Sequence, residues 1–193
     1  GLDDCWQAYN WLVDNAENFG INPKKVILIG DSAGGNLALS LVLLLIKGKK
    51  RVPDGLFIAY PGLYLTAEYY TPSLLESLED PVLSYQYLEL FLNSYLEEPA
   101  RGLRDPIASP VIAPESHLQF FPPTRIVVGT KDPLHDDSWR LMDKLKRAGC
   151  NVNMTAYLDM PHGFLMHDIP DGLPQASVCV KECADEIREL LKI

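Results

Sequence analysis

The chain has 193 residues, of which 17 are basic and 26 acidic, so its formal net charge is −9 at neutral pH. This acidic balance makes it a poor candidate for binding nucleic acid or an anionic membrane surface, and its 47% hydrophobic residues exclude a disordered tail. The longest apolar run, 37–46, is interrupted only by Ser40 and is about half the length that spans a bilayer, so we expect no transmembrane segment.

The first third of the chain alternates between helical and extended patterns. Apolar periodicity predicts, in chain order, a helix over 2–18, a strand over 26–29, a helix over 33–47 and a strand over 56–60. The first strand is a continuous apolar run, which indicates burial on both faces. Glycines follow both helices, as expected of helix ends.

Residues 63–123 interrupt this alternation with many prolines and one helix, predicted near 83–96. An excursion of this length between two strands of a compact domain is usually a lid or a binding loop. We therefore expect a lid segment over 63–123.

The regular alternation then returns. The remaining predicted elements are a strand over 125–129, a helix over 136–148, a strand over 152–158 and a helix over 176–192. This order predicts a single α/β domain over 1–193, with a parallel sheet and helices on both of its faces. Ligands of such sheets bind beyond the carboxyl ends of the strands, so the functional residues are expected there.

The segment after the first predicted strand contains the pattern G-x-S-x-G and reads Gly30-Asp31-Ser32-Ala33-Gly34-Gly35. This pattern is typical of a sharp turn that exposes a nucleophilic serine, and it requires small residues two positions before and after Ser32. The helix that follows directs its N-terminus at the serine, so the Ala33 N–H is a candidate oxyanion-hole donor. A phosphate-binding loop is disfavoured because the G-K-[ST] ending and the G-x-G-x-x-G spacing are both missing.

A nucleophilic serine needs a base, and the base needs an orienting acid. Asp132 follows the third predicted strand and His162 follows the fourth, so Ser32, Asp132 and His162 are the candidate catalytic triad. Three alternatives stay open. Ser32 could be only a helix cap, and His162 could be only a loop histidine. Asp132 could be a turn residue before Pro133, with Asp136 or Asp137 as the acid, although both of these are plausible N-caps of the next helix.

Several segments of this sequence resemble the hormone-sensitive lipase group of α/β-hydrolases. The matching segments are Gly30-Asp31-Ser32-Ala33-Gly34-Gly35-Asn36-Leu37, Arg51-Val52-Pro53-Asp54-Gly55, Ala59-Tyr60-Pro61, Asp105-Pro106-Ile107-Ala108-Ser109-Pro110, Asp132-Pro133-Leu134 with Asp136-Asp137, and Pro161-His162-Gly163-Phe164-Leu165. The resemblance implies hydrolysis of lipid or smaller carboxylic esters through an acyl-enzyme, with no metal and no organic cofactor.

One feature of that family is missing from this sequence. The family carries a His-Gly-Gly-Gly motif whose backbone N–H groups supply most of the oxyanion hole, and this chain has none. The resemblance therefore implies a C-terminal portion of a longer hydrolase that lacks the N-terminal strands, paired with the missing half or with another copy. Each lost donor typically costs about 10²–10³ in rate, so we expect little activity from this chain alone.

Three further interpretations concern the lid aromatics, the alternative function and the cellular compartment. Seven aromatic residues of the lid segment could line an acyl site or pack as a helix face on the core; they are Tyr64, Tyr69, Tyr70, Tyr85, Tyr87, Phe91 and Tyr95. A ligand receptor or inactive hydrolase-like module is the alternative function, although related plant receptors lack the histidine that this chain keeps at His162. Four cysteines without a C-x-x-C pair favour a reducing compartment, and thus the cytoplasm.

Overall fold

A computed structural model describes residues 1–66 and 68–192; Ala67 and Ile193, which fall within the expected domain, lie outside the described residues. Four parallel strands form one sheet in the order β1-β2-β3-β4. They are β1 (Ile27–Asp31), β2 (Gly55–Ala59), β3 (Thr124–Gly129) and β4 (Val152–Tyr157). All four strands lie within two residues of their predicted bounds, and the parallel pairing confirms the expected sheet.

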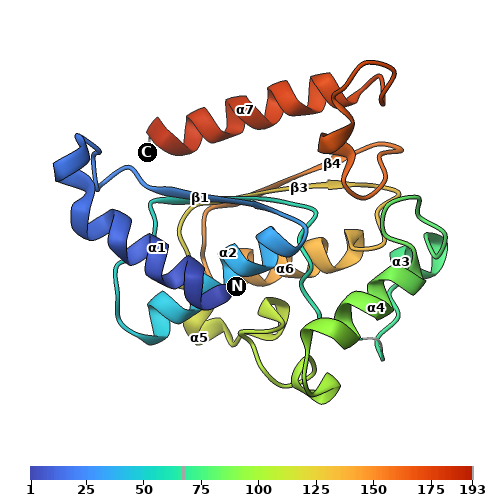
Figure 1. Cartoon of the computed structure of the whole chain (residues 1–193), viewed down its shortest axis with the longest axis horizontal. Helices are drawn as coiled ribbons and strands as arrows, with labels where there is room; N and C mark the ends of the chain where they lie inside the picture. The colour runs from blue at the N-terminus through green and yellow to red at the C-terminus, as the bar shows by residue number, and fades with distance from the viewer. Residues whose placement is uncertain (67, 193) are drawn as a thin grey trace.

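Helices cover both faces of this sheet (Figure 1). On one face lie α1 (Leu2–Asn15), α2 (Ala33–Lys47) and α6 (His135–Arg147), and on the other face lies α7 (Ala176–Lys192). The expected α/β class, with helices on both faces, is confirmed. No helix within 1–66 or 68–192 is both long enough and apolar enough to cross a membrane.

The two faces of β2 build two separate cores. Leu56 and Ile58 are buried against the α2 and α6 side, whereas Phe57 and Ala59 are buried against α7. This alternation follows from the two-residue period of a strand. Because β2 has a strand on either side and helices on both faces, all five of its residues are apolar or glycine and all are buried.

Strand β1 is less buried than its sequence indicates. It pairs with β2 alone among the described strands, and the Ile29 side chain is 58% exposed. The prediction that this strand is buried on both faces is therefore wrong. A continuous apolar run indicates that a strand is suited to burial, but neighbouring elements decide whether it is covered.

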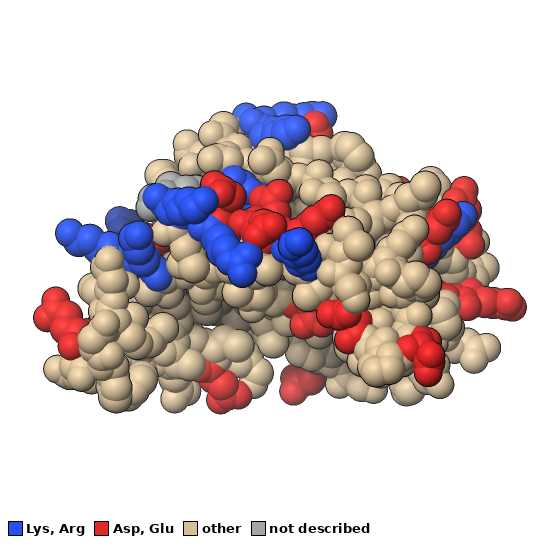
Figure 2. All heavy atoms as spheres, turned by 90° about the horizontal axis from the view of Figure 1, so that it is seen from above, with Lys and Arg blue, Asp and Glu red and all other residues tan. Residues whose placement is uncertain are grey.

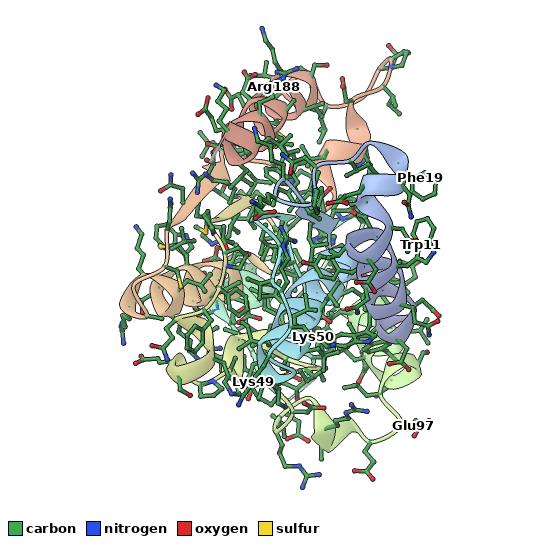
Figure 3. The ribbon with its side chains drawn as sticks, turned by 90° about the vertical axis from the view of Figure 1, so that its left-hand side faces the viewer. Trp11, Phe19, Lys49, Lys50, Glu97 and Arg188 are labelled. Atoms are coloured by element: carbon green, nitrogen blue, oxygen red, sulfur yellow. The ribbon has the colours of Figure 1, made fainter. Side chains whose placement is uncertain are left out.

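The first predicted helix also ends earlier than expected. The α-helix stops at Asn15, and a 3₁₀ turn follows over Ala16–Phe19, closed by Gly20 at φ 68°. The tighter turn brings Phe19 back onto Trp11, with ring centroids 5.4 Å apart. Figure 3 shows both aromatic rings on the outer side of α1, where each is more than half exposed.

Charges on the α7 side of the molecule are of mixed sign. Figure 2 shows acidic and basic side chains interspersed on this face. One pair anchors the helix to the sheet: the Arg125 guanidinium on β3 lies 3.0 Å from the Glu186 carboxylate on α7. The arginine is largely buried, so this pair is less screened by solvent than the exposed ion pairs along α7.

The excursion between β2 and β3 contains several short helices. They are α3 (Pro72–Glu76), α4 (Tyr85–Tyr95), η2 (Pro99–Arg101), η3 (Pro110–Ile112) and α5 (Glu115–Leu118). Helix α4 is the one predicted near 83–96. The excursion is held to α6 by the Lys144 ammonium, which donates to the carbonyl oxygens of Val111 and Ala113 at 2.7 Å each.

Candidate active site

Ser32 occupies the turn between β1 and α2. Its backbone has φ 50° and ψ −117°, a conformation that costs a non-glycine residue free energy and that occurs mainly at functional sites. The Ser32 N–H donates to the Ala59 carbonyl at 2.9 Å, which ties the turn to the end of β2. The sharp strand-to-helix turn expected at this serine is therefore present.

The glycines around Ser32 meet different constraints from those expected. A Cβ on Gly30 would lie 2.3 Å from the Gly34 carbonyl oxygen, and a Cβ on Gly35 would lie 2.8 Å from the Pro61 Cβ. A Cβ on Gly34 would have its nearest contact at 3.8 Å, from an Asp31 carboxylate oxygen. The expectation that both Gly30 and Gly34 must be small is thus wrong for Gly34, because a Cβ added there would point away from the crowded backbone.

The three candidate triad residues form one hydrogen-bonded chain. The Ser32 Oγ lies 2.8 Å from the His162 Nε2, and the His162 Nδ1 lies 3.0 Å from the Asp132 Oδ2. Asp132 is fully buried and its Oδ1 accepts a hydrogen bond from the Leu134 N–H. Burial raises the pKa of the Asp132 carboxyl, and the hydrogen bond from His162 opposes that rise. The geometry is that of a nucleophile, a base and an orienting acid.

The two alternative acids lie elsewhere. The Asp136 carboxylate accepts a hydrogen bond from the Ser73 N–H at 2.9 Å, and Asp137 pairs with Arg140 at 3.4 Å. Neither one is the partner of the His162 imidazole. Their expected role as N-cap is also wrong, because α6 begins one residue earlier with Leu134 as its N-cap. Both acids instead lie in the first helical turn, where negative charge is favoured by the helix dipole.

Asp137 should make stability depend on pH. Burial raises its pKa to about 6, and Arg140 only partly opposes this. The folded state therefore binds a proton more tightly than the unfolded state, so this group's contribution to stability falls as pH rises from about 4 to about 6. We expect Asp137→Asn to stabilise the chain at pH 7.5 by about 1–3 kcal/mol, and to have little benefit at pH 4. Urea unfolding at the two pH values measures this; an equal effect at both would contradict it.

Two residues outside the candidate triad contact His162: Tyr60, from the matching segment Ala59-Tyr60-Pro61, and Asp80, which no sequence motif singled out. The Tyr60 ring lies edge-on to the imidazole with centroids 5.0 Å apart, and its backbone is at φ 36° directly after β2. The His162 N–H donates to the buried carboxylate of Asp80, which comes from the excursion. The one sequence signal at Asp80 is the Asp-Pro dipeptide, which predicts a turn and nothing about the histidine.

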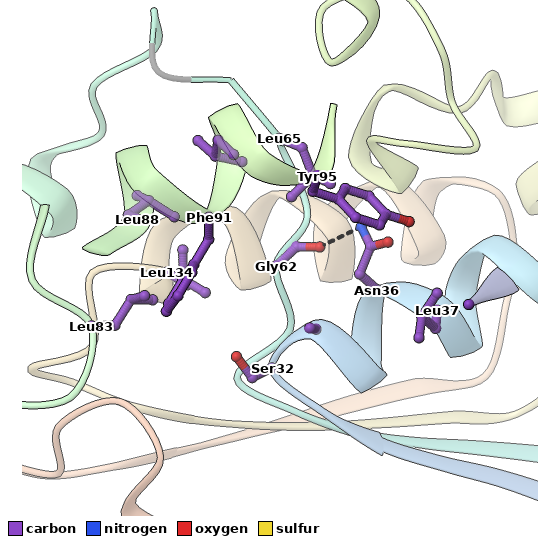
Figure 4. Close-up of a pocket in the computed structure, with 13 residues that line it drawn as sticks. Ser32, Asn36, Leu37, Gly62, Leu65, Leu83, Leu88, Phe91, Tyr95 and Leu134 are labelled. Carbon is purple, nitrogen blue, oxygen red and sulfur yellow. Dashed lines mark hydrogen bonds between the residues drawn. The ribbon is translucent and has the colours of Figure 1, made fainter. Parts of the chain in front are cut away.

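An apolar cavity of about 290 Å³ opens beside Ser32 (Figure 4). Helix α4 forms one wall with Leu88, Phe91 and Tyr95, while Ser32 lies at the opposite side of the cavity. A cavity this apolar can bind a hydrocarbon group while Ser32 meets the polar end of the same molecule.

The seven aromatic residues considered for an acyl site lie in different surroundings, and only two of them line the cavity. Phe91 and Tyr95 line the cavity beside Ser32. Tyr64 and Tyr69 instead pack together beneath the Arg140 guanidinium, which lies 4.8 Å from the Tyr69 ring centroid. The remaining three stack in pairs near α4: Tyr70 with Tyr85, and Tyr87 with Phe91.

Asn36 fastens the excursion to the helix that follows Ser32. Its side-chain amide donates to the carbonyl oxygens of Gly62 and Ala108 at 2.7 and 2.9 Å, and it is almost fully buried. Ser40, one turn later, donates to the Ile107 carbonyl at 2.6 Å. The matching segments 30–37 and 105–110 of the family resemblance are therefore in direct contact.

The fold and the hydrogen-bonded chain at Ser32 define an α/β-hydrolase-type protein. A family model of the alpha/beta hydrolase fold matches residues 1–166, and the chain belongs to this family. It is 34% identical to an esterase of Acinetobacter venetianus over 95% of this chain and 57% of that protein. It is 38% identical to the hormone-sensitive lipase of Mus musculus over 49% of this chain and 12% of that protein, which confirms the expected resemblance.

A solved structure and a further curated relative show the same similarity. Carboxyl esterase 2 of the fungus Tuber melanosporum superimposes with a TM-score of 0.90 at 28% identity, over 98% of this chain and 62% of that one. The carboxylesterase NlhH of Mycobacterium tuberculosis is 31% identical over 86% of this chain and 51% of its own length. The chain thus spans about half the length of the curated relatives that match nearly all of it.

Proposed function

We propose that this chain is the catalytic portion of a serine carboxylic-ester hydrolase. The observation that carries the proposal is the chain of hydrogen bonds from Ser32 Oγ through His162 to Asp132, at 2.8 and 3.0 Å. Relatives named esterase and carboxylesterase support the same reaction class. A triad of this kind needs neither a metal ion nor an organic cofactor.

In the first half of the proposed reaction, Ser32 Oγ attacks the ester carbonyl carbon while His162 Nε2 takes the hydroxyl proton. The carbonyl π pair moves onto oxygen and forms a tetrahedral oxyanion. When this collapses, the bond to the alkoxide breaks, and the leaving oxygen takes the proton from His162 Nε2. Asp132 holds the imidazole with its Nε2 toward Ser32 and stabilises the transient imidazolium.

The second half regenerates the serine. A water molecule attacks the acyl-enzyme carbonyl and gives its proton to His162 Nε2, which forms a second tetrahedral oxyanion. Collapse releases the carboxylic acid, and Ser32 Oγ recovers its proton from the histidine. The Ala33 N–H, at the first position of α2, is the proposed backbone donor to both oxyanions. We propose that further donors come from an N-terminal half of the hydrolase or from a second copy of the chain.

The apolar cavity favours esters with a hydrocarbon acyl or alcohol group, either small molecules or lipids. We propose that residues 1–193 are one α/β-hydrolase domain and that 63–123 are its lid, because helix α4 from this segment forms a wall of the cavity. Four free cysteines, two of them buried, support the cytoplasm as the compartment.

Hydrolysis of p-nitrophenyl butyrate tests this function. We expect Ser32-dependent turnover from a form that includes any residues preceding Gly1 in the natural protein, and slower turnover from this chain alone. Ser32→Ala should lower kcat by about 10⁴-fold or more, with the fold retained. A folded protein that hydrolyses no ester over a range of acyl lengths would favour the inactive receptor or module instead.

A further inference from the structure

A short part of the excursion, residues 71–83, lies against the loop that carries Asp132; we call it the strap. The Ser73 Oγ donates to the Pro133 carbonyl at 3.0 Å, and the Ser77 Oγ donates to the Lys131 carbonyl at 2.9 Å. These two carbonyl groups flank Asp132 in the sequence. The strap therefore contacts the backbone on both sides of the proposed catalytic acid.

The strap also contacts the loop that carries the proposed base. Asp80 is 7% exposed, and its Oδ2 accepts a hydrogen bond from the His162 backbone N–H at 3.1 Å. Its Oδ1 accepts hydrogen bonds from the Val82 and Leu83 N–H groups at 2.9 and 2.7 Å. Three backbone N–H groups thus satisfy a buried carboxylate, which would be costly to bury without such partners.

The two carboxylate oxygens of Asp80 have different tasks. Oδ1 caps the turn over 80–83 and would suffice to form it. Oδ2 binds a residue 82 positions away in the sequence, on a loop in which the non-glycine residue Asp159 lies in the left-handed region at φ 56°. A loop with such a backbone depends on outside contacts to keep one conformation.

We propose that Asp80 is a positioning residue for His162, and that the strap sets the alignment of the imidazole with both Ser32 and Asp132. This inference rests on the function proposed above. Proton transfer between Ser32 Oγ and His162 Nε2 needs a hydrogen-bond distance, and the present distance of 2.8 Å meets this need. A displacement of about 1 Å in such a geometry can cost about 10²-fold in rate.

Asp80→Asn separates the two tasks of this residue. Asparagine has one acceptor oxygen, and the Val82 and Leu83 N–H groups both require it. The amide NH₂ then faces the His162 N–H, donor against donor, so the turn is kept and the contact with the histidine is lost. Asp105→Asn is the matched control, because Asp105 caps a similar turn through the Ile107 N–H and pairs with Arg101.

We expect Asp80→Asn to lower kcat by about 10–100-fold while KM changes by less than about threefold. Asp105→Asn should change kcat by less than about twofold. The low-field proton resonance of the His162 Nδ1–H bonded to Asp132 should be present in the wild type and in Asp105→Asn, and it should broaden or move in Asp80→Asn. A merely structural role for Asp80 would lower stability without moving this resonance.

Two results would overturn the inference. One is an Asp80→Asn protein with wild-type kcat and an unchanged low-field resonance. The other needs no variant: rapid hydrogen exchange of the His162 amide in the wild-type protein would show that the bond to Asp80 is not formed.

If Asp80→Asn does not fold, Asp80→Ser keeps a short acceptor for the turn and still removes the contact with the histidine. A wild type without Ser32-dependent hydrolysis would contradict the proposed function instead, while the resonance and the amide exchange still test the role of Asp80.

Discussion

Asp132→Asn is expected to lower kcat by about 10⁴-fold with little change in KM. The asparagine carbonyl can still accept the Leu134 N–H at the Oδ1 position, so the loop should keep its shape. Its NH₂ then faces the His162 Nδ1 and favours the tautomer that carries its proton on Nε2. In that tautomer the imidazole cannot take the proton of Ser32.

Steady-state hydrolysis of p-nitrophenyl butyrate, with thermal unfolding as the check on folding, measures this effect. Asp143→Asn is a suitable control because Asp143 is an exposed acid of α6 that pairs with Arg147. That control should keep kcat within about twofold, since exposed ion pairs contribute little. If Asp132→Asn retained more than a tenth of wild-type kcat, Asp132 would not be the orienting acid.

Gly30→Ala and Gly34→Ala are expected to differ sharply in stability, although the two glycines hold equivalent places in the G-x-S-x-G pattern. A methyl group on Gly30 meets the Gly34 carbonyl oxygen at 2.3 Å, and neither backbone can move without opening the turn. We expect a loss of about 3 kcal/mol or more, together with the loss of Ser32-dependent hydrolysis. A methyl group on Gly34 finds ordinary contact distance, and alanine is the better helix former by about 1 kcal/mol.

Urea unfolding of the two variants tests this contrast. The Gly34→Ala protein should unfold at the wild-type urea concentration or above it. The opposite ranking, or an equal loss of stability in both variants, would mean that the backbone at Gly34 is as crowded as the backbone at Gly30. Gly35→Ala is a third variant of the same kind, and it should be destabilising because its methyl group would meet Pro61 at 2.8 Å.

Local sequence patterns predicted most of the regular structure. Helix α2 has its predicted bounds, because its residues are nearly all apolar and Gly48 follows. The three candidate triad residues also follow from local signals, since each lies directly after a predicted strand. Parallel strands end at the same edge of a sheet, so residues 100 positions apart are brought together once the topology is known.

Other features depended on neighbours that a local pattern does not describe. Ile29 has the same apolar character as the residues of β2, but its side chain is 58% exposed on a strand that pairs with β2 alone among the described strands. The space that a Cβ at Gly34 would find depends on the direction in which this atom would point in the strained turn. The start of α6 at His135 depends on how the buried Asp132 loop enters the helix.

The sequence alone therefore determined the α/β class, the order of the elements, and Ser32, Asp132 and His162 as the candidate triad, because these follow from periodicity and from residue types at strand ends. Only the tertiary structure decided which acid contacts the imidazole, which glycine is crowded, and that Asp80 holds the histidine loop. Those outcomes depend on distances between segments far apart in the chain, and hydrogen bonds and steric contacts act over only a few ångströms.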